Sequence, residues 1–263
     1  MTHPDTGPGP SPATATDSAD GDPTLDRLAG EWWIYQRQHT QRYSTDDILV
    51  AHSALEARPQ AAQVLDMGAG VGSVGLLTLL GLPASSRLTA VEILADSAGL
   101  MRRTIEHNDL GSRARVVCGD LREPQVLDAR ARFDLVVANP PYLPERAATA
   151  SPHAARAAAR LELHGDVLAY CQAANRWLAP GGAFCFCHAA DDKRPEQAIL
   201  SAGLHLLSRR DVVFREGRRP TIALFTCAAE GETVPTRPLL IRRRDGARSD
   251  AFCQIRRRLL MDA

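Results

Sequence analysis

Residues 133–142 read Phe-Asp-Leu-Val-Val-Ala-Asn-Pro-Pro-Tyr, an apolar run followed by a polar residue, two prolines and an aromatic residue. Its apolar part predicts a buried strand from Leu135 to Ala138. The strand cannot continue through Pro140, because proline has no N–H to donate to a sheet and pushes the residue before it into an extended conformation. The chain therefore leaves the sheet at Asn139, so that a polar side chain stands at the end of a buried strand.

The Asn-Pro-Pro-Tyr string after this strand suits the chemistry of a planar amine. Such an amine is a poor nucleophile, because its lone pair is delocalised into the adjoining ring or carbonyl. The side-chain oxygen of Asn139 and the carbonyl of Pro140 could accept both N–H hydrogens and favour a pyramidal nitrogen. Tyr142 would stack on a flat base. The plain alternative is a strand end followed by a proline turn.

A strand, a glycine turn and a helix are predicted upstream, over residues 64–77. The turn carries Gly68, Gly70 and Gly72. Glycines let the backbone approach a ligand closely, and the start of the helix presents free N–H groups. A dinucleotide fingerprint would place another glycine where Ser73 stands. Asp66, just before the turn, would repel a diphosphate but suits an ammonium group. The turn alone is a weak signal for any one cofactor.

Two more predicted strands end in acids. The strand from Arg87 ends at Glu92, in the place for a carboxylate that accepts both ribose hydroxyls; a surface glutamate is the alternative. The next strand leads to Asp120, which could accept the amino hydrogens of an adenine, with Leu121 against the ring. Successive strand ends therefore put four functions along the carboxyl edge of one parallel sheet, where ligands bind in open α/β folds.

The rest of the chain predicts a protein with appendages around one domain. Residues 1–23 lack large apolar residues and are predicted to be a disordered tail, with residues 24–263 forming the domain. The Trp-rich segment from Pro23 to Tyr35 predicts a short helix. Residues 204–213 and 221–227 predict a final hairpin-like pair of strands.

Composition and cysteine usage predict a soluble cytoplasmic protein. No apolar run approaches the roughly 20 residues that a membrane span needs. The six cysteines form no Cys-x-x-Cys pair and follow no signal segment, which indicates reduced core thiols. Cys185 and Cys187 alternate along a predicted strand next to His188, and we interpret them as core residues, with no metal site.

These motifs together resemble the Asn-Pro-Pro-Tyr class of S-adenosylmethionine-dependent methyltransferases, and most of all bacterial tRNA(Val) adenine-N6 methyltransferases. The likeness runs from about residue 36 to 260. It includes the Ser-Thr-Asp segment at 44–46, the Ala-Arg-x-Glu block at 159–162 and the Pro-Gly-Gly lead-in at 180–182. The resemblance implies a class I fold: a doubly wound, mostly parallel seven-stranded sheet with a C-terminal antiparallel hairpin.

The resemblance also implies a function and its residues. It implies methyl transfer from S-adenosyl-L-methionine to the N6 amine of an adenine in RNA, at position 37 of tRNA(Val), with Asn139, Pro140 and Tyr142 at the amine. Tyr43, Thr45 and Asp46 would lie over the methionine end of the cofactor, although a plain helix cap also explains them. Two alternatives remain open: an N5-glutamine methyltransferase acting on a protein such as a release factor, and a cofactor-binding scaffold without activity.

Charge is distributed unevenly along the chain. Formal net charge is zero, yet residues 205–263 carry 13 Arg against 7 Asp plus Glu, a net of 13 − 7 = +6. Three late segments hold the clusters that predict an RNA contact: Arg215, Arg218 and Arg219; Arg242, Arg243 and Arg244; Arg256, Arg257 and Arg258. Such clusters can track a phosphate backbone, whereas the alternative is an ordinary solvated surface.

Overall fold

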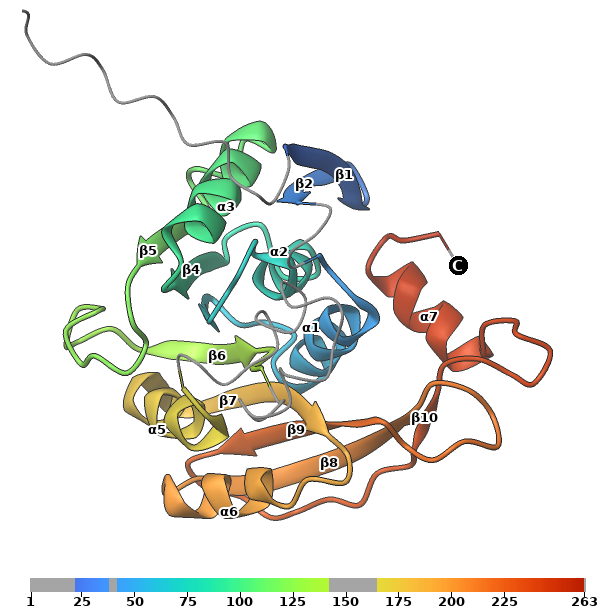
Figure 1. Ribbon diagram of the computed structural model, residues 1–263. Helices are drawn as coiled ribbons and strands as arrows, with labels where there is room; N and C mark the ends of the chain where they lie inside the picture. The colour runs from blue at the N-terminus through green and yellow to red at the C-terminus, as the bar shows by residue number, and fades with distance from the viewer. Residues whose placement is uncertain (1–21, 38–41, 142–164, 263) are drawn as a thin grey trace, which may run out of the picture.

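The fold is one mixed sheet with helices on both faces, preceded by a hairpin (Figure 1). The computed structural model describes residues 22–37, 42–141 and 165–262. The strands of the sheet are β3 (Gln63–Met67), β4 (Arg87–Glu92), β5 (Ala114–Cys118), β6 (Phe133–Ala138), β7 (Leu178–Ala189), β8 (His205–Val213), β9 (Ile222–Ala228) and β10 (Leu239–Leu240). Their order is β10-β8-β9-β7-β6-β3-β4-β5.

The pairing confirms the predicted sheet and adds one strand to it. β7, β6, β3, β4 and β5 are mutually parallel, and β9 runs antiparallel between β7 and β8. Eight strands stand where seven were expected. The extra one is β10, in which Leu239 and Leu240 pair parallel to the end of β8. A strand of two residues is too short to be recognised from the sequence. Leu239 and Leu240 form a strand only because β8 lies beside them and pairs with them.

The helices cover the two faces of the sheet in sets. The helices are α1 (Thr45–Ala57), α2 (Ser73–Leu80), α3 (Ala95–His107), α5 (Val167–Trp177), α6 (Arg194–Ser201) and α7 (Asp250–Arg258). Side chains of α1, α2, α3 and α7 share one buried cluster, while those of α5 and α6 share another. Alternate residues of β6 enter the two clusters, with Val137 in the first and Val136 in the second. This is the alternation expected of a strand that is buried on both faces.

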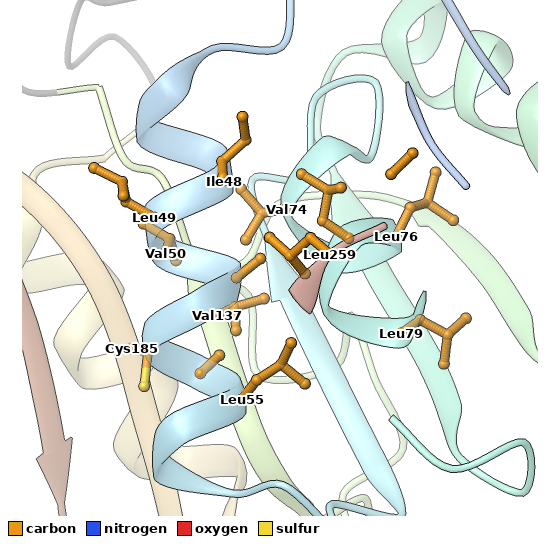
Figure 2. Close-up of a cluster of buried hydrophobic side chains, with 14 of the residues drawn as sticks. Ile48, Leu49, Val50, Leu55, Val74, Leu76, Leu79, Val137, Cys185 and Leu259 are labelled. Atoms are coloured by element: carbon orange, nitrogen blue, oxygen red, sulfur yellow. The ribbon is translucent and has the colours of Figure 1, made fainter. Parts of the chain in front are cut away.

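Helix α1 is the central element of the first cluster. Figure 2 shows Ile48, Leu49 and Leu55 of α1 together with Val137 of the sheet and Leu259, which follows α7. Leu49 and Leu259 have no exposed surface, and Leu55 is 1% exposed. Burying a leucine contributes roughly 1.5–3 kcal/mol. The packing fixes α1 against the sheet, and with it the start of α1, which reaches the end of β6.

The helix predicted for the Trp-rich segment is wrong: the segment is a β-hairpin. β1 (Pro23–Ala29) and β2 (Trp32–Arg37) pair antiparallel. Gly30 has a φ of 54°, which glycine adopts readily in a tight turn. Side chains at the end of α3 satisfy the outer edge of β2. Thr104 accepts from the Tyr35 N–H at 3.0 Å, and Asn108, which follows α3, accepts from the Trp33 N–H at 2.8 Å. Neighbouring aromatic and β-branched residues favour a strand, and this tertiary contact overrides the helical interpretation.

The predicted final pair of strands is confirmed, and it corresponds to β8 and β9. The three arginines at the basic end of the chain lie in α7. All six cysteines are free, and Cys185 and Cys187 lie in the same buried cluster. Cys118 is exposed and Cys253 is partly exposed, so the prediction of a core thiol is wrong for Cys118. Among the described residues, no helix has the length and apolar character that crossing a membrane requires. Residues 1–21 of the predicted tail lie outside the described residues.

Candidate active site

Four neighbouring parallel strands end at one side of the sheet, which we name the carboxyl edge. β6, β3, β4 and β5 lie next to one another. Their register is nearly level, with Glu92 opposite Cys118 and Asp66 opposite Val137. The residues predicted for these strand ends are therefore brought to one edge: Gly68, Glu92, Asp120 and Asn139.

The glycine turn after β3 has a left-handed backbone. Gly68, Gly70 and Gly72 have φ angles of 63°, 55° and 91°. A Cβ at Gly68 would clash with the hydroxyl of Tyr170 from α5, and a Cβ at Gly72 would lie 2.7 Å from the side chain of Met101 from α3. Positive φ and the approach of these two side chains therefore require glycine here, before any ligand is considered.

Glu92 ends β4 and is 5% exposed. Its Oε2 accepts from the backbone N–H of Gly70 at 2.7 Å, and its Oε1 accepts from that of Leu94 at 2.8 Å. A carboxylate oxygen can accept two hydrogen bonds, so each oxygen keeps one position for a further donor. Two adjacent hydroxyls on a ligand would fill these positions. The same carboxylate already ties the glycine turn to β4.

Two buried aspartates lie behind the glycine turn. Asp66 is 1% exposed, and its Oδ2 accepts from the backbone N–H of Gly75 at 2.8 Å. Burial, with a smaller contribution from the carboxylates of Asp47 and Glu92, raises the pKa of Asp66 to about 7. Burial also raises the pKa of Asp47 to about 6, against hydrogen bonds that stabilise its charged form. A cation at this edge would favour the ionised form of both groups.

Asn139 is held from two sides. Its side-chain Nδ2 donates to Oδ1 of Asp47 at 2.6 Å, and its Oδ1 accepts from the thiol of Cys187 at 3.0 Å. The thiol is in reach because β6 and β7 are parallel with Ala138 opposite Phe186, which puts the next residue of each strand at the same level. The amide orientation is set by its partners, because an ionised carboxylate can only accept.

Only some of the residues predicted to lie around this amide are among the described residues. Pro140 follows Asn139 and is buried. Tyr142 lies outside the described residues, as does the Ala-Arg-x-Glu block at 159–162. Thr45 and Asp46 are partly buried in the first turn of α1.

The carboxylate that reaches Asn139 belongs to Asp47, which the sequence argument missed. The Ser44-to-Asp47 spacing is a helix-capping pattern, and Asp47 does accept from the Ser44 N–H at 2.8 Å. Its second contact could not be read from spacing, because it joins two segments 92 residues apart. Cys187 could have been found by counting the register from β6, whereas nothing in the sequence singles out Tyr170.

The end of β5 is arranged differently from the expectation for an adenine. Nε of Arg122 lies 2.9 Å from both carboxylate oxygens of Asp120. Leu121 is 6% exposed and belongs to the second buried cluster. The apolar side chain that is open near Glu92 is that of Leu94, which is 50% exposed. Leu94 is therefore better placed than Leu121 to meet a flat ring.

A protein family matches the part of the sequence that forms these strand ends. Residues 44–186, more than half of the chain, match the family described as "Methyltransferase small domain". This chain belongs to the methyltransferase small domain family. It is a methyltransferase, and its methyl donor is S-adenosylmethionine. The matched range begins at the N-cap of α1 and ends in β7, so it contains the ends of β3, β4, β5 and β6.

Several curated proteins that are similar to this chain share a name. They are called tRNA1(Val) (adenine(37)-N6)-methyltransferase. The protein from Actinobacillus pleuropneumoniae is 26% identical, over 86% of this chain and 92% of its own length. The one from Cronobacter sakazakii is 28% identical, over 86% and 90%, and the one from Citrobacter koseri 29%, over 84% and 89%. The similarity thus covers nearly the whole length of each.

Solved structures support the fold. A predicted O-methyltransferase from Agrobacterium tumefaciens matches with a TM-score of 0.59 at 20% identity, over 83% of this chain and 98% of that one. The tRNA m1G37 methyltransferase of M. jannaschii matches with a TM-score of 0.53 at 17% identity, over 80% and 55%. At these identities the likeness concerns the fold alone.

The residues of the carboxyl edge fit the methyl donor of this methyltransferase. S-adenosylmethionine bears a positive sulfonium, an ammonium group and a ribose diol. The open positions on Glu92 match the diol, and the buried carboxylates of Asp47 and Asp66 match a cation. A dinucleotide would instead bring a diphosphate against these acids, which like-charge repulsion opposes.

Proposed function

We propose that this chain transfers the methyl group of S-adenosylmethionine to the exocyclic N6 amine of an adenine in RNA, with tRNA as the substrate class and adenine 37 of tRNA(Val) as the target. One observation carries the proposal. The amide of Asn139 stands at the end of a buried strand with its nitrogen bound to Asp47, so that its oxygen is the atom left to receive an amine.

The chain's own residues have defined tasks in this reaction. Oδ1 of Asn139 and the carbonyl of Pro140 accept the two N–H hydrogens of the target amine, which directs its lone pair at the methyl group and lets the nitrogen become pyramidal. Oδ1 keeps a free acceptor position, because the thiol of Cys187 occupies only one. Tyr142, which lies outside the described residues, would stack on the adenine.

The cofactor side is assigned to the neighbouring strand ends. When bound, S-adenosylmethionine supplies an activated methyl group on a positive sulfur. Glu92 accepts the ribose hydroxyls, the turn of Gly68, Gly70 and Gly72 lies beside the nucleoside, and Asp66 stabilises the positive charge. Leu94 offers an apolar surface to the adenine ring. Asp120, Leu121, Thr45 and Asp46 are the further cofactor-binding residues proposed from the sequence.

Two of the three arginine clusters stand at the same edge of the sheet as Asn139. β7 is parallel to β6, and β9 is antiparallel to both β7 and β8, so β8 runs parallel to β6. β10 is in turn parallel to β8. The segments after β8 and β10 therefore leave from the carboxyl edge. They touch each other, because the Glu216 N–H donates to the carbonyl of Arg242 at 2.9 Å. β8 is three strands from β6, or roughly 15 Å along the edge.

The third cluster is tied into the fold. Nη2 of Arg258 donates to the carbonyl of Leu55 at 3.0 Å, at the end of α1. Nε of Arg256 donates to the carbonyl of Asp262 at 2.5 Å, and Arg257 is exposed. We assign the RNA phosphates chiefly to the first two clusters, because the segments that carry them leave from the carboxyl edge. The tRNA substrate itself is taken from the names of the relatives.

Methylation of defined RNAs tests the function. The purified protein, S-adenosylmethionine and unmodified tRNA(Val) should yield N6-methyladenosine at one position, read by mass spectrometry of nucleosides and fragments. A transcript with adenine 37 changed to guanine should stay unmodified. A protein that ignores tRNA and methylates a glutamine of a release factor would overturn the RNA assignment and support the glutamine alternative.

Salt dependence tests the arginine surface separately. Replacing Arg218, Arg219 and Arg242 by alanine should lower the slope of log affinity against log salt, by about 0.7 for each single-strand phosphate that is no longer neutralised. The matched control is the triple variant Arg87→Ala, Arg115→Ala and Arg132→Ala, which removes equal charge at the opposite edge of the sheet. Equal slopes in the two variants would mean that RNA does not follow the carboxyl-edge arginines.

A further inference from the structure

The amide of Asn139 lies between two side chains from different elements. Asp47 is in the first turn of α1, and Cys187 is near the end of β7. The carboxylate accepts from the amide nitrogen at 2.6 Å, and the thiol donates to the amide oxygen at 3.0 Å. An amide has two orientations that differ only by exchange of its nitrogen and oxygen. These two partners select the same one of the two.

We propose that Asp47 is a positioning residue for methyl transfer: its carboxylate, together with the Cys187 thiol, holds the Asn139 amide with its oxygen toward the target amine. The inference rests on the proposed function in one respect, namely that Asn139 receives the amine. Turned the other way, the amide would present two N–H donors to an amine that also donates. Asp47 therefore controls whether the site can accept the substrate's hydrogens at all.

Asp47 is itself held so firmly that it can impose this orientation. It is 5% exposed, and its Oδ2 accepts from the Ser44 N–H at 2.8 Å and from the Ser73 hydroxyl at 3.1 Å. Oδ1 is thus left for Asn139. The first bond belongs to the cap of α1 and the second to the start of α2, so both helices fix the carboxylate. A rotation of Asp47 would break both bonds at once.

The orientation depends on the ionisation of Asp47. A protonated carboxyl can donate, so it could bond to the amide oxygen and remove the preference for the productive orientation. Two acidic groups face Asp47, namely Asp46 of the same helix and Asp66 of β3. Burial, with a smaller contribution from Asp46, raises the pKa of Asp47 to about 6, against hydrogen bonds from Asn139, Ser44 and Ser73. Methyl transfer should therefore fall as pH drops through that region.

Cys187 should not add a second transition in the working pH range. Burial, followed by the carboxylates of Asp46 and Asp47, raises the pKa of its thiol well above the usual value. The thiol thus stays protonated and remains a donor to Asn139. A serine at this position keeps a donor, whereas an alanine removes it. The pair Cys187→Ser and Cys187→Ala therefore tests the second side of the amide without changing charge.

The kinetic test uses single turnovers at saturating cofactor, so that cofactor affinity does not enter. In the wild type the rate should rise with pH and level off above an inflection at or somewhat below 6, because the cationic cofactor favours the ionised carboxylate. Asp47→Asn should lower the plateau by roughly 10- to 100-fold and flatten the profile. Glu56→Gln, which removes a carboxylate from the last turn of the same helix, should behave as the wild type.

A double-mutant cycle separates positioning from a general loss of structure. If Asp47 acts through Asn139, Asp47→Asn should have almost no further effect on the rate in an Asn139→Ala background. Additive losses would overturn the proposal. So would a wild-type pH profile that Asp47→Asn leaves unchanged. Cys187→Ala should reduce the rate several-fold, and Cys187→Ser should restore most of it; equal rates in the two would remove the thiol from the proposal.

A measurement without substrate keeps the inference distinct from the proposed function. The side-chain 15N–1H2 resonances of Asn139, assigned with an Asn139→Ala variant, should titrate with an apparent pKa near 6 in the wild type and not in Asp47→Asn. Resonances that do not move between pH 5 and 8 would overturn the inference. A protein that shows this titration but fails to methylate any RNA would instead refute the proposed function alone.

Discussion

The two edges of the sheet hold charged side chains in different surroundings. At the carboxyl edge, Asp47, Asp66 and Glu92 are buried, and within the described part of the chain none of them forms an ion pair with a cation. At the opposite, amino edge, a hollow of about 430 Å³ is lined by four arginines. They are Arg87, Arg113, Arg115 and Arg132. No ion pair joins these four to an acid in the described ranges either.

The hydrogen bonds, rather than the charges, distinguish the edges. The amino-edge arginines donate mainly to backbone carbonyls, as Arg113 does to Leu79 and Pro83 at 3.2 and 3.1 Å. These bonds satisfy backbone carbonyls at and just after the end of α2, and the arginine side chains remain partly solvated. At the carboxyl edge, burial raises the pKa of Asp47 and of Asp66, because their hydrogen bonds offset the desolvation of these carboxylates only in part. Carboxylates whose burial is incompletely compensated therefore distinguish the site, whereas a cluster of charge does not.

The largest expected effect at the carboxyl edge comes from Asn139→Ala. Losing the acceptor for the target amine should slow methyl transfer roughly 100-fold or more, as for loss of one positioned transition-state group. Cofactor affinity, measured by calorimetry, should stay nearly the same. A parallel loss of cofactor affinity would mean that Asn139 belongs to the cofactor side and that the two halves of the site are wrongly divided.

The second effect concerns Glu92 and the cofactor. Glu92→Ala leaves two ribose hydroxyls without an acceptor and also frees the N–H groups of Gly70 and Leu94. The loss should be of order 1–3 kcal/mol, or roughly ten- to a hundred-fold in affinity for S-adenosylmethionine. Glu92→Gln keeps one acceptor oxygen, so its affinity for S-adenosylmethionine should lie between that of Glu92→Ala and that of the wild type. Unchanged affinity in Glu92→Ala, or binding of NAD, would contradict the assignment.

Sequence patterns predicted most of the carboxyl edge because strand ends are local features. An apolar run that stops at Asn139 or Glu92 determines where the chain leaves the sheet, and parallel pairing then aligns those ends. The hairpin of β1 and β2 was missed for the opposite reason. Its edge is stabilised by the side chain of Asn108, which follows α3 and is 75 positions away from Trp33 in the chain.

The orientation of Asn139 could not be predicted from spacing. Its two partners, Asp47 and Cys187, are 92 and 48 positions distant, and each has a sufficient local explanation as a helix cap or a core thiol. The same holds for Leu94 and Leu121, since the sequence does not reveal which leucine is exposed. Burial and tertiary contact decide these assignments, and they follow from packing of whole elements.

The third effect is a pH dependence that only the carboxyl edge should show. The folded pKa of Asp66, about 7, is above its ordinary value of 3.8, so this group favours the folded state at low pH and that contribution is lost as pH rises through 7. A bound cation requires the ionised form, so cofactor affinity should rise about tenfold from pH 6 to 8. Calorimetry in buffers of different ionisation enthalpy should detect the proton released.

The variant Asp66→Asn sharpens this test. It should flatten the dependence of cofactor affinity on pH, while raising the melting temperature of the free protein at pH 8, where the wild type must hold a buried charge. Stability and binding would then change in opposite directions. If the cofactor-free Asp66→Asn variant were instead less stable at pH 8 than the cofactor-free wild type, the Asp66 carboxylate would have a stabilising partner. The difference proposed here between the carboxyl edge and the amino edge would then be wrong.

The smallest functional effect is expected from Arg113→Ala at the amino edge. Three carbonyls, of Leu79, Pro83 and Ser86, would lose a charged donor, which should cost about 1–3 kcal/mol of the free energy of unfolding. Arg132→Ala, which loses bonds only within its own loop, should leave the melting temperature almost unchanged. Neither variant should alter cofactor affinity or its pH dependence. A change in affinity in Arg113→Ala without a change in melting temperature would show that the arginines of the amino edge contact a ligand, because a purely structural cation can affect binding only through the stability of the fold.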